Sequence, residues 1–234
     1  MVNFLESPNH LVYGQCAMFH THEMPMICPT WQPEVLRRLQ AIQWSPDKDE
    51  EKLTPHGHAM ARLPLHPRLA HMVLRAEDSK ENGTDLGSVA TLCALLEEER
   101  DVLQDSQRGL CADVATRLRA LRGEDLPQRY RNMTVLPKHC SRVMQNAKRL
   151  QEDLKTKTKS VTRPGPLLAL AFPERVARRG KKGRFVLRDG SMCTVKDPVL
   201  QNEDFLAVGR LKNKVVTLAA PLLASEAAVH ILPS

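Results

Sequence analysis

The sequence predicts an α+β fold in which a bundle of helices precedes a small all-β module. Aromatic residues make up only 4% of the chain and apolar residues 42%. The core must therefore come from Leu, Val, Ala and Met, a composition that favours helices. Apolar residues recur at helical spacing up to about residue 154, whereas two hairpin patterns of alternating residues follow Gly180.

The helical part contains several amphipathic segments separated by loop signals. Thr54 can cap a helix that has Pro55 at its first position, and a second helix begins at Pro67 and is broken at Asn82-Gly83. Residues 45–52 are polar and acidic and are predicted to form a linker. The expected helices span residues 31–43, 55–63, 67–81, 85–100, 110–122, 138–154 and 167–179.

The β-module is predicted from two hairpins. Asp189-Gly190 supplies the turn positions that need positive φ, and short apolar strands lie on both sides of it. A second hairpin is expected between residues 205 and 219, around Lys212-Asn213. We expect this module to be cut short at Ser234.

The chain lacks the common signatures of catalysis, metal binding and membrane insertion. There is no GxxxxGK[ST] loop for a nucleotide's phosphates, and no catalytic residue is predicted. The six cysteines form no CxxC pair, so no metal site is expected, and the acidic stretch 97–101 is interpreted as a solvated helix end. With neither a secretion signal nor an apolar run of about 18 residues, we predict a cytoplasmic protein without membrane contact.

Basic residues are concentrated in the second half of a chain whose net charge is +7. The sharpest cluster is predicted to lie on one helix surface and the turn after it, where each cation can neutralise a phosphate and Phe185 can offer a stacking face. The alternative is a solvated helix end whose cations favour the C-terminal dipole. The cluster consists of Arg175, Arg178, Arg179, Lys181, Lys182 and Arg184.

A second group of cations precedes this cluster. Arg142, Lys148 and Arg149 lie in the predicted helix over 138–154 and can extend the same path for nucleic acid. Their alternative interpretation is an ordinary solvated helix face.

Three stretches of the chain together carry a resemblance to known proteins. Residues 53–74, LTPHGHAMARLPLHPRLAHMVL, are similar to the signature that joins the winged-helix domain of DExH helicases to their helical ratchet bundle, and they include Gly57, Pro67, Arg68 and Leu69. Residues 167–179, LLALAFPERVARR, followed by Gly183-Arg184-Phe185, resemble the HrpB branch of ATP-dependent DExH-box RNA helicases. Residues 14–19, GQCAMF, are similar to the segment after motif VI of the second RecA-like domain.

This resemblance implies a division of the chain into four parts. Residues 1–30 correspond to the end of the second RecA-like domain, and residues 31–52 to a shortened winged helix with a linker. Residues 53–160 correspond to the ratchet bundle. Residues 161–234 correspond to the HrpB-type helix and an OB-like β-module.

The resemblance also implies a function and partners. A C-terminal part of such a helicase guides single-stranded RNA or another nucleic acid without hydrolysing ATP itself, and its partners include the motor domains that the sequence does not contain. ATP and magnesium belong to the intact parent, and no cofactor is expected in this chain. Arg68 is expected to tie the bundle to its neighbour through charge-assisted hydrogen bonds.

Two other functions remain open from the sequence. The chain can be a stand-alone basic adaptor that binds RNA or ribosomes. It can also be a non-functional remnant of a damaged helicase gene.

Overall fold

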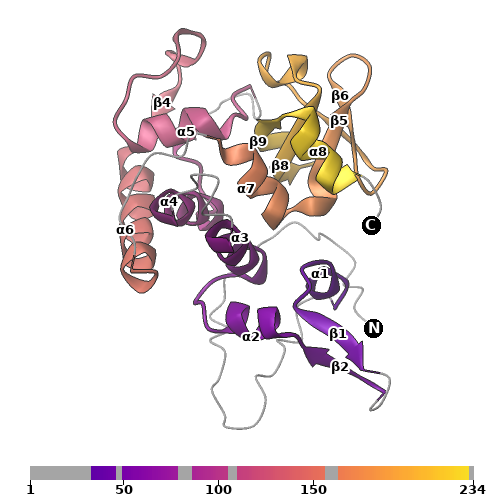
Figure 1. The fold of residues 1–234 in the computed structure, drawn as a ribbon. Helices are drawn as coiled ribbons and strands as arrows, with labels where there is room; N and C mark the ends of the chain where they lie inside the picture. The colour runs from indigo at the N-terminus through magenta and orange to yellow at the C-terminus, as the bar shows by residue number, and fades with distance from the viewer. Residues whose placement is uncertain (1–32, 46–48, 79–85, 105–109, 156–162, 232–234) are drawn as a thin grey trace, which may run out of the picture.

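The computed structural model describes residues 33–45, 49–78, 86–104, 110–155 and 163–231, which form a small N-terminal unit, a helical bundle and a β-barrel (Figure 1). The stretch 1–30, expected to end a RecA-like domain, lies outside the described residues, and so does its motif at residues 14–19.

A β-hairpin forms in the N-terminal unit where the sequence predicts a linker. Helix α1 (Pro33–Arg38) leads to strand β1 (Ile42–Ser45), which pairs antiparallel with β2 (Glu50–Leu53). Ile42 pairs with Leu53, and both pack into the small core of this unit, so Ser45 and Glu50–Lys52 are held in paired strands. The linker prediction for residues 45–52 is therefore wrong at Ser45 and at residues 50–52, and residues 46–48 lie outside the described ranges.

The helix predicted over 31–43 is also too long. Gln40 adopts φ 56°, a left-handed conformation that turns the chain after α1. Helix α2 (Pro55–Ala61) confirms the predicted cap, because Thr54 Oγ1 accepts a hydrogen bond from Gly57 N at 2.9 Å.

Four further helices confirm the predicted bundle. They are α3 (Pro67–Asp78), α4 (Leu86–Glu97), α5 (Val114–Leu121) and α6 (Pro137–Asp153). The Asp113 carboxylate caps α5 by accepting from Ala115 N and Thr116 N, which sets the start of that helix later than predicted. Between the helices, β3 (Leu103–Gln104) pairs with β4 (Thr134–Val135), and a 3-10 turn, η2, spans Gln128–Tyr130.

The helix predicted over 167–179 is wrong in its second half. Helix α7 (Pro164–Ala171) ends before Pro173, which cannot donate the hydrogen bond that a continuing helix needs. The chain then passes through a 3-10 turn, Pro173–Arg175, into strand β5 (Val176–Arg179). Arg178 and Arg179 therefore lie on a strand and not on a helix surface.

Five strands close into a barrel, which confirms an α+β fold with an OB-like module. The other four strands are β6 (Arg184–Leu187), β7 (Met192–Thr194), β8 (Phe205–Lys212) and β9 (Val215–Leu222). The order around the barrel is β5-β6-β7-β9-β8. The pairing of β7 with β9 is parallel, at Thr194 and Val215, and the others are antiparallel.

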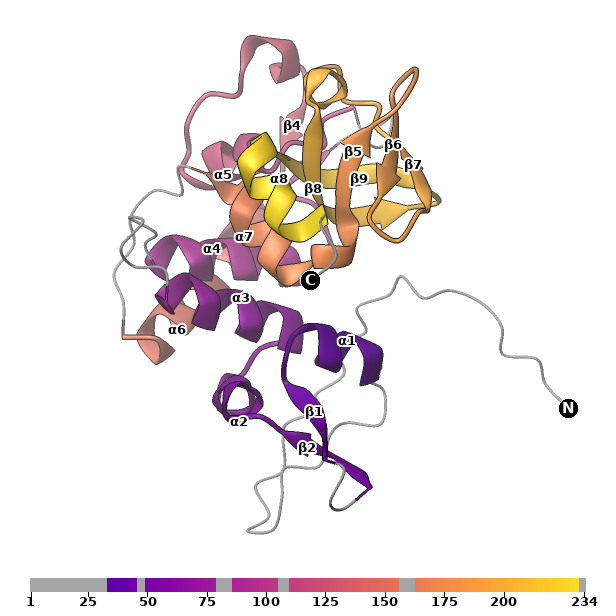
Figure 2. The same cartoon turned by 45° about the vertical axis from the view of Figure 1, so that its right-hand side comes forward.

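The two predicted turns differ in detail from the expectation. Only Gly190 of Asp189-Gly190 has positive φ, at 84°. The second turn lies at Asn213 and Lys214, with φ of 51° and 62°, which are the two left-handed positions of a tight hairpin. Helix α8 (Ala224–Ile231), which the sequence analysis does not predict, packs against β5 and β8 (Figure 2).

Charged side chains join the bundle to the barrel. Arg117, which is 1% exposed, binds Asp101 and donates to the carbonyl oxygen of Thr217 on β9 at 3.3 Å. Arg210 of β8 donates to the carbonyl oxygens of Leu96 and Glu98 at the end of α4, at 3.3 and 2.8 Å. The two parts are therefore held together by polar contacts as well as by a continuous core.

Main-chain contacts complete this junction. Ala219 N of β9 donates to Ala112 O at 2.8 Å, and Asp113 forms a parallel bridge with Ala219. The fully buried carboxylate of Asp197 accepts from Ala112 N at 2.8 Å and from the Tyr130 hydroxyl at 2.7 Å. The loop after β7 is thus fixed to the segment that precedes α5 and to η2.

Candidate nucleic-acid interface

The turn between β5 and β6 presents two lysines. Gly180 N donates to Arg184 O at 2.8 Å, which closes the turn around Lys181 and Lys182. Lys182 and Gly183 both have positive φ, 54° and 69°, so the chain reverses tightly and the lysine side chains are exposed. Arg184 begins β6 beside them and is exposed as well.

Two other segments meet this turn at the same end of the barrel. Val195 N donates to Gly183 O at 2.9 Å, and Thr194 N donates to Lys214 O at 2.8 Å. These bonds place the end of β7 between the β5–β6 turn and the β8–β9 turn. Six exposed cations therefore belong to one surface, which we call the barrel rim: Lys181, Lys182, Arg184, Lys196, Lys212 and Lys214.

Half of the barrel rim was missed by the sequence analysis. Lys196, Lys212 and Lys214 are separated in sequence from the cluster at 175–184, and only the closing of the barrel brings them to it. The predicted turn at Lys212-Asn213 was the one available signal, because hairpin turns gather at the ends of a barrel.

The outer face of β5 and β6 continues the rim along the strands. Arg178 pairs with Val186, and Val186 pairs in turn with Met192, which is 56% exposed. Phe185 has the opposite orientation and is 0% exposed in the barrel core, because side chains alternate across a strand. The prediction that Phe185 offers a stacking face is therefore wrong.

Two arginines of the predicted cluster are engaged within the protein. Arg175 Nη1 donates to Gly209 O at 3.1 Å, its guanidinium lies 4.9 Å from the Phe172 ring centroid, and burial lowers its pKa. Arg179 donates to Asn202 O at 3.0 Å and pairs with the Asp204 carboxylate at 2.5 Å. Arg175 lies on a turn and is mostly covered by the protein, whereas Arg179 is exposed on β5 and its charge is compensated by the exposed Asp204. Neither arginine is therefore counted in the barrel rim.

The cations of the rim are differently placed. Among the described residues, Arg178 and the six rim residues form no ion pair and no side-chain hydrogen bond with one another or with other side chains. Their charges are therefore directed to solvent or to a ligand.

The cations of α6 do not extend this surface. Helix α6 packs against α4, whereas the barrel strands β8 and β9 pack against α7, and both views show α6 on the other side of the bundle (Figures 1 and 2). Lys148 and Arg149 are exposed there, and Arg142 lies 3.7 Å from the buried Glu98 carboxylate. They form a separate basic face.

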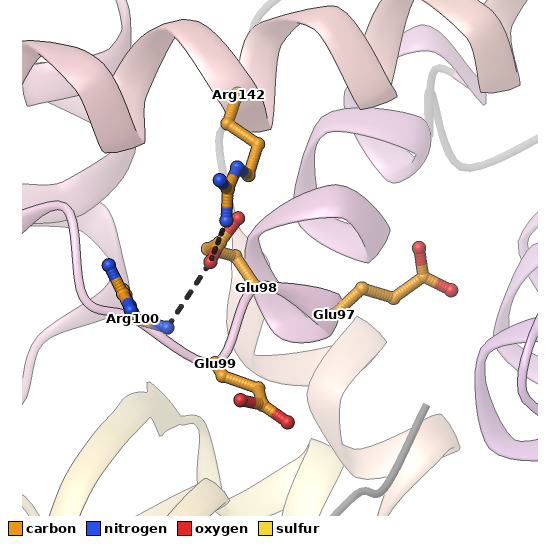
Figure 3. A pocket seen from close by; sticks show the side chains of 5 residues that line it. All are labelled: Glu97, Glu98, Glu99, Arg100 and Arg142. Carbon is orange, nitrogen blue, oxygen red and sulfur yellow. Dashed lines mark hydrogen bonds and ion pairs between the residues drawn. The ribbon is translucent and has the colours of Figure 1, made fainter. Parts of the chain in front are cut away.

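A pocket of about 390 Å³ lies beside Arg142, at the end of α4 (Figure 3). Its lining residues are Glu97, Glu98, Glu99, Arg100 and Arg142. Glu98 is only 7% exposed and accepts from Arg100 N at 3.4 Å, so this stretch is not simply the solvated helix end that the sequence predicts. Burial raises the pKa of Glu97 to about 7.

The signature residues have structural positions. A Cβ at Gly57 would lie 2.0 Å from Ala41 O, so α2 approaches β1 through this glycine. Pro67 and Leu69 are buried at the start of α3. Arg68 Nη1 donates to Ala171 O and to Glu174 Oε2, both at 3.0 Å, and so connects α3 to the end of α7.

The described ranges contain neither a metal-binding cluster nor a membrane-spanning helix. No group of three or more His, Cys, Asp and Glu side chains there is arranged to hold a metal ion. His56 Nε2 lies 2.9 Å from His71 Nδ1, a hydrogen bond between α2 and α3. Of the helices described, none has the length and apolar composition needed to cross a bilayer.

Comparison with solved structures shows a shared fold. The chain superposes on the Escherichia coli DExH-box NTPase HrpB with a TM-score of 0.59 and 24% identity, covering 84% of this chain and 21% of that one. It superposes on a second structure, the Escherichia coli DEAH/RHA helicase HrpB, with a TM-score of 0.57 and 22% identity, covering 82% and 21%. The chain thus spans about a fifth of the length of either. No protein-family model and no curated protein matches it.

Proposed function

We propose that this chain binds single-stranded nucleic acid at the barrel rim and serves as a nucleic-acid-guiding, C-terminal part of an HrpB-like RNA helicase. The observation that carries the proposal is the gathering of six exposed cations at one end of a five-stranded barrel. In OB folds the second and third strands and the turns 1–2 and 4–5 bind oligonucleotides, and the rim cations occupy the equivalent elements β6, the β5–β6 turn and the β8–β9 turn.

Binding of this kind is electrostatic. A cation that neutralises a phosphate releases a counterion, so the logarithm of the binding constant falls linearly with the logarithm of the salt concentration. Each phosphate contact with a single strand contributes about 0.7 to the size of this slope. No aromatic side chain among the residues named for the rim and its outer face is available for stacking, since Phe185 is buried. Affinity is therefore modest and depends little on base sequence.

The motor domains of the intact helicase are the proposed protein partners. The fold shared with one fifth of HrpB supports this assignment. The sequence has no phosphate-binding GxxxxGK[ST] loop, so we expect ATP and magnesium to act in those domains and the isolated chain to show no ATP turnover.

The proposal is tested by fluorescence anisotropy with a labelled oligouridylate at several salt concentrations. The variant K181Q/K182Q/R184Q should lower the salt slope by about 2, because it removes up to three phosphate contacts. The matched control K138Q/K148Q/R149Q removes three exposed charges from α6, on the separate basic face, and should leave the slope unchanged. Equal losses in both variants, or salt-independent binding of the unmodified protein, would contradict the proposal.

A further inference from the structure

The barrel rim has a neighbour on the helical bundle. Lys196, an exposed rim residue, is followed by Asp197, whose carboxylate is fully buried. The Tyr130 hydroxyl donates to Asp197 Oδ1 at 2.7 Å, and burial together with this bond raises the pKa of the tyrosine, which keeps it a donor. The 3-10 turn η2, Gln128–Tyr130, is thereby held against the rim.

Two arginines lie on either side of Tyr130. Arg129 and Arg131 are both exposed, and the Arg129 guanidinium lies 5.8 Å from the Tyr130 ring centroid. The Arg129 guanidinium thus lies over the Tyr130 ring, and the Tyr130 hydroxyl binds the buried Asp197 carboxylate. Lys196 directly precedes Asp197 in the chain. Two acidic residues precede η2: Glu124 is paired with Arg119 and Arg122, so its charge is compensated, and Asp125 is exposed.

We infer that the nucleic-acid site crosses from the barrel onto the bundle, with Arg129 and Arg131 contacting the phosphates of a strand that leaves the rim beside Lys196. This inference rests on the proposed function and assigns its ligand a minimum length. A short oligonucleotide binds to the barrel rim alone, whereas a longer one also reaches η2. The barrel and the bundle then contact the same nucleic-acid strand at two places whose separation is fixed, because Tyr130 and Asp197 hold the two surfaces together.

The test compares two ligand lengths. Labelled oligouridylates of about 5 and about 15 nucleotides bracket most of the site sizes known for single OB folds. The variant R129Q/R131Q should bind the longer one about 25-fold more weakly at 0.1 M salt, because each lost contact is worth about fivefold there, and its salt slope should fall by about 1.4. Its affinity for the shorter one should stay within twofold.

The control variant K148Q/R149Q makes the same charge change on α6 and should alter neither affinity. All four positions are exposed, so thermal melts of the variants should coincide with that of the unmodified protein.

Each other outcome has a distinct meaning. Equal losses for both lengths, an unchanged affinity for the longer one, or an equal loss in the α6 control would overturn the extension onto the bundle. If the unmodified protein binds neither length in a salt-dependent way, the proposed function itself fails, and this inference fails with it.

Discussion

The contact between Arg68 and Glu174 supports a quantitative prediction about stability. The guanidinium binds both carboxylate oxygens, at 3.0 and 2.7 Å, and both side chains are largely buried, with 13% and 14% exposed. Arg175 Nε lies 3.6 Å from Glu174 Oε1, one of the two oxygens that Arg68 binds. Glu174 therefore compensates two cations, which also share the Phe172 ring at 5.3 and 4.9 Å.

The two partners should not be equally costly to remove. Breaking a buried ion pair by removing one member costs about 3 to 5 kcal/mol, because the remaining charge stays buried without compensation. In R68M the Glu174 carboxylate keeps Arg175, so we expect a loss of about 2 to 3 kcal/mol. In E174Q both guanidinium groups lose their counter-charge, so the loss should reach about 3 to 5 kcal/mol.

Urea unfolding of R68M, E174Q and the double variant measures these values by linear extrapolation. The double variant should be less destabilised than the sum of the single ones by about 1 to 2 kcal/mol, since contacting residues are not additive. Arg62 is exposed and precedes α3, the helix that carries Arg68. The control R62M should therefore change the free energy of unfolding by less than about 0.5 kcal/mol. A loss below about 1 kcal/mol in E174Q, or simple additivity, would refute this account of the contact.

Two further predictions concern the N-terminal unit and the pocket at the end of α4. In G57A the added methyl meets Ala41 O at 2.0 Å, so the unit around α2 should lose about 1 to 3 kcal/mol of stability, measured as faster hydrogen exchange at residues 36–45 and 50–60. The variant H58A, on the exposed side of α2, should change little. For Glu97, the folded protein keeps its proton up to a pKa of about 7, whereas the unfolded chain loses it near 4.5, so the folded state binds more protons between these values and stability falls as pH rises. The unfolding free energy of the unmodified protein relative to E97Q should therefore decrease from about pH 4.5 to about pH 7, and a rise across that window would show that the carboxyl is not desolvated.

The sequence predicts well those elements that are decided by neighbouring residues. Thr54 and Pro55 define the start of α2 through a cap and a fixed φ, and both act within one turn. The helices α3, α4 and α6 follow from apolar spacing for the same reason. Gly190 and its hairpin are also local.

Non-local pairing explains the failures. The residues after Phe172 keep a helix-like pattern, but Pro173 stops the helix and the partners of β5 lie on β6 and β8. The strand conformation there is decided by pairing with residues about thirty positions away, as Val176 with Ala207 shows. Half of the barrel rim was missed for the same reason, because Thr194 meets Lys214 only when the parallel β7–β9 pair closes the barrel.

The backbone contact between the bundle and β9 has a consequence for how the chain can be divided. Strand β9 pairs with β8 along one side, but with β7 only at Val215, and Ala112 and Asp113 cover part of its other side at Ala219. An uncovered strand edge is a template for addition of a strand from another molecule. A barrel expressed from residue 163 onward would expose this edge, and self-association would then compete with folding. The segment before α5 thus protects the barrel from aggregation, and the bundle and the barrel should be produced together.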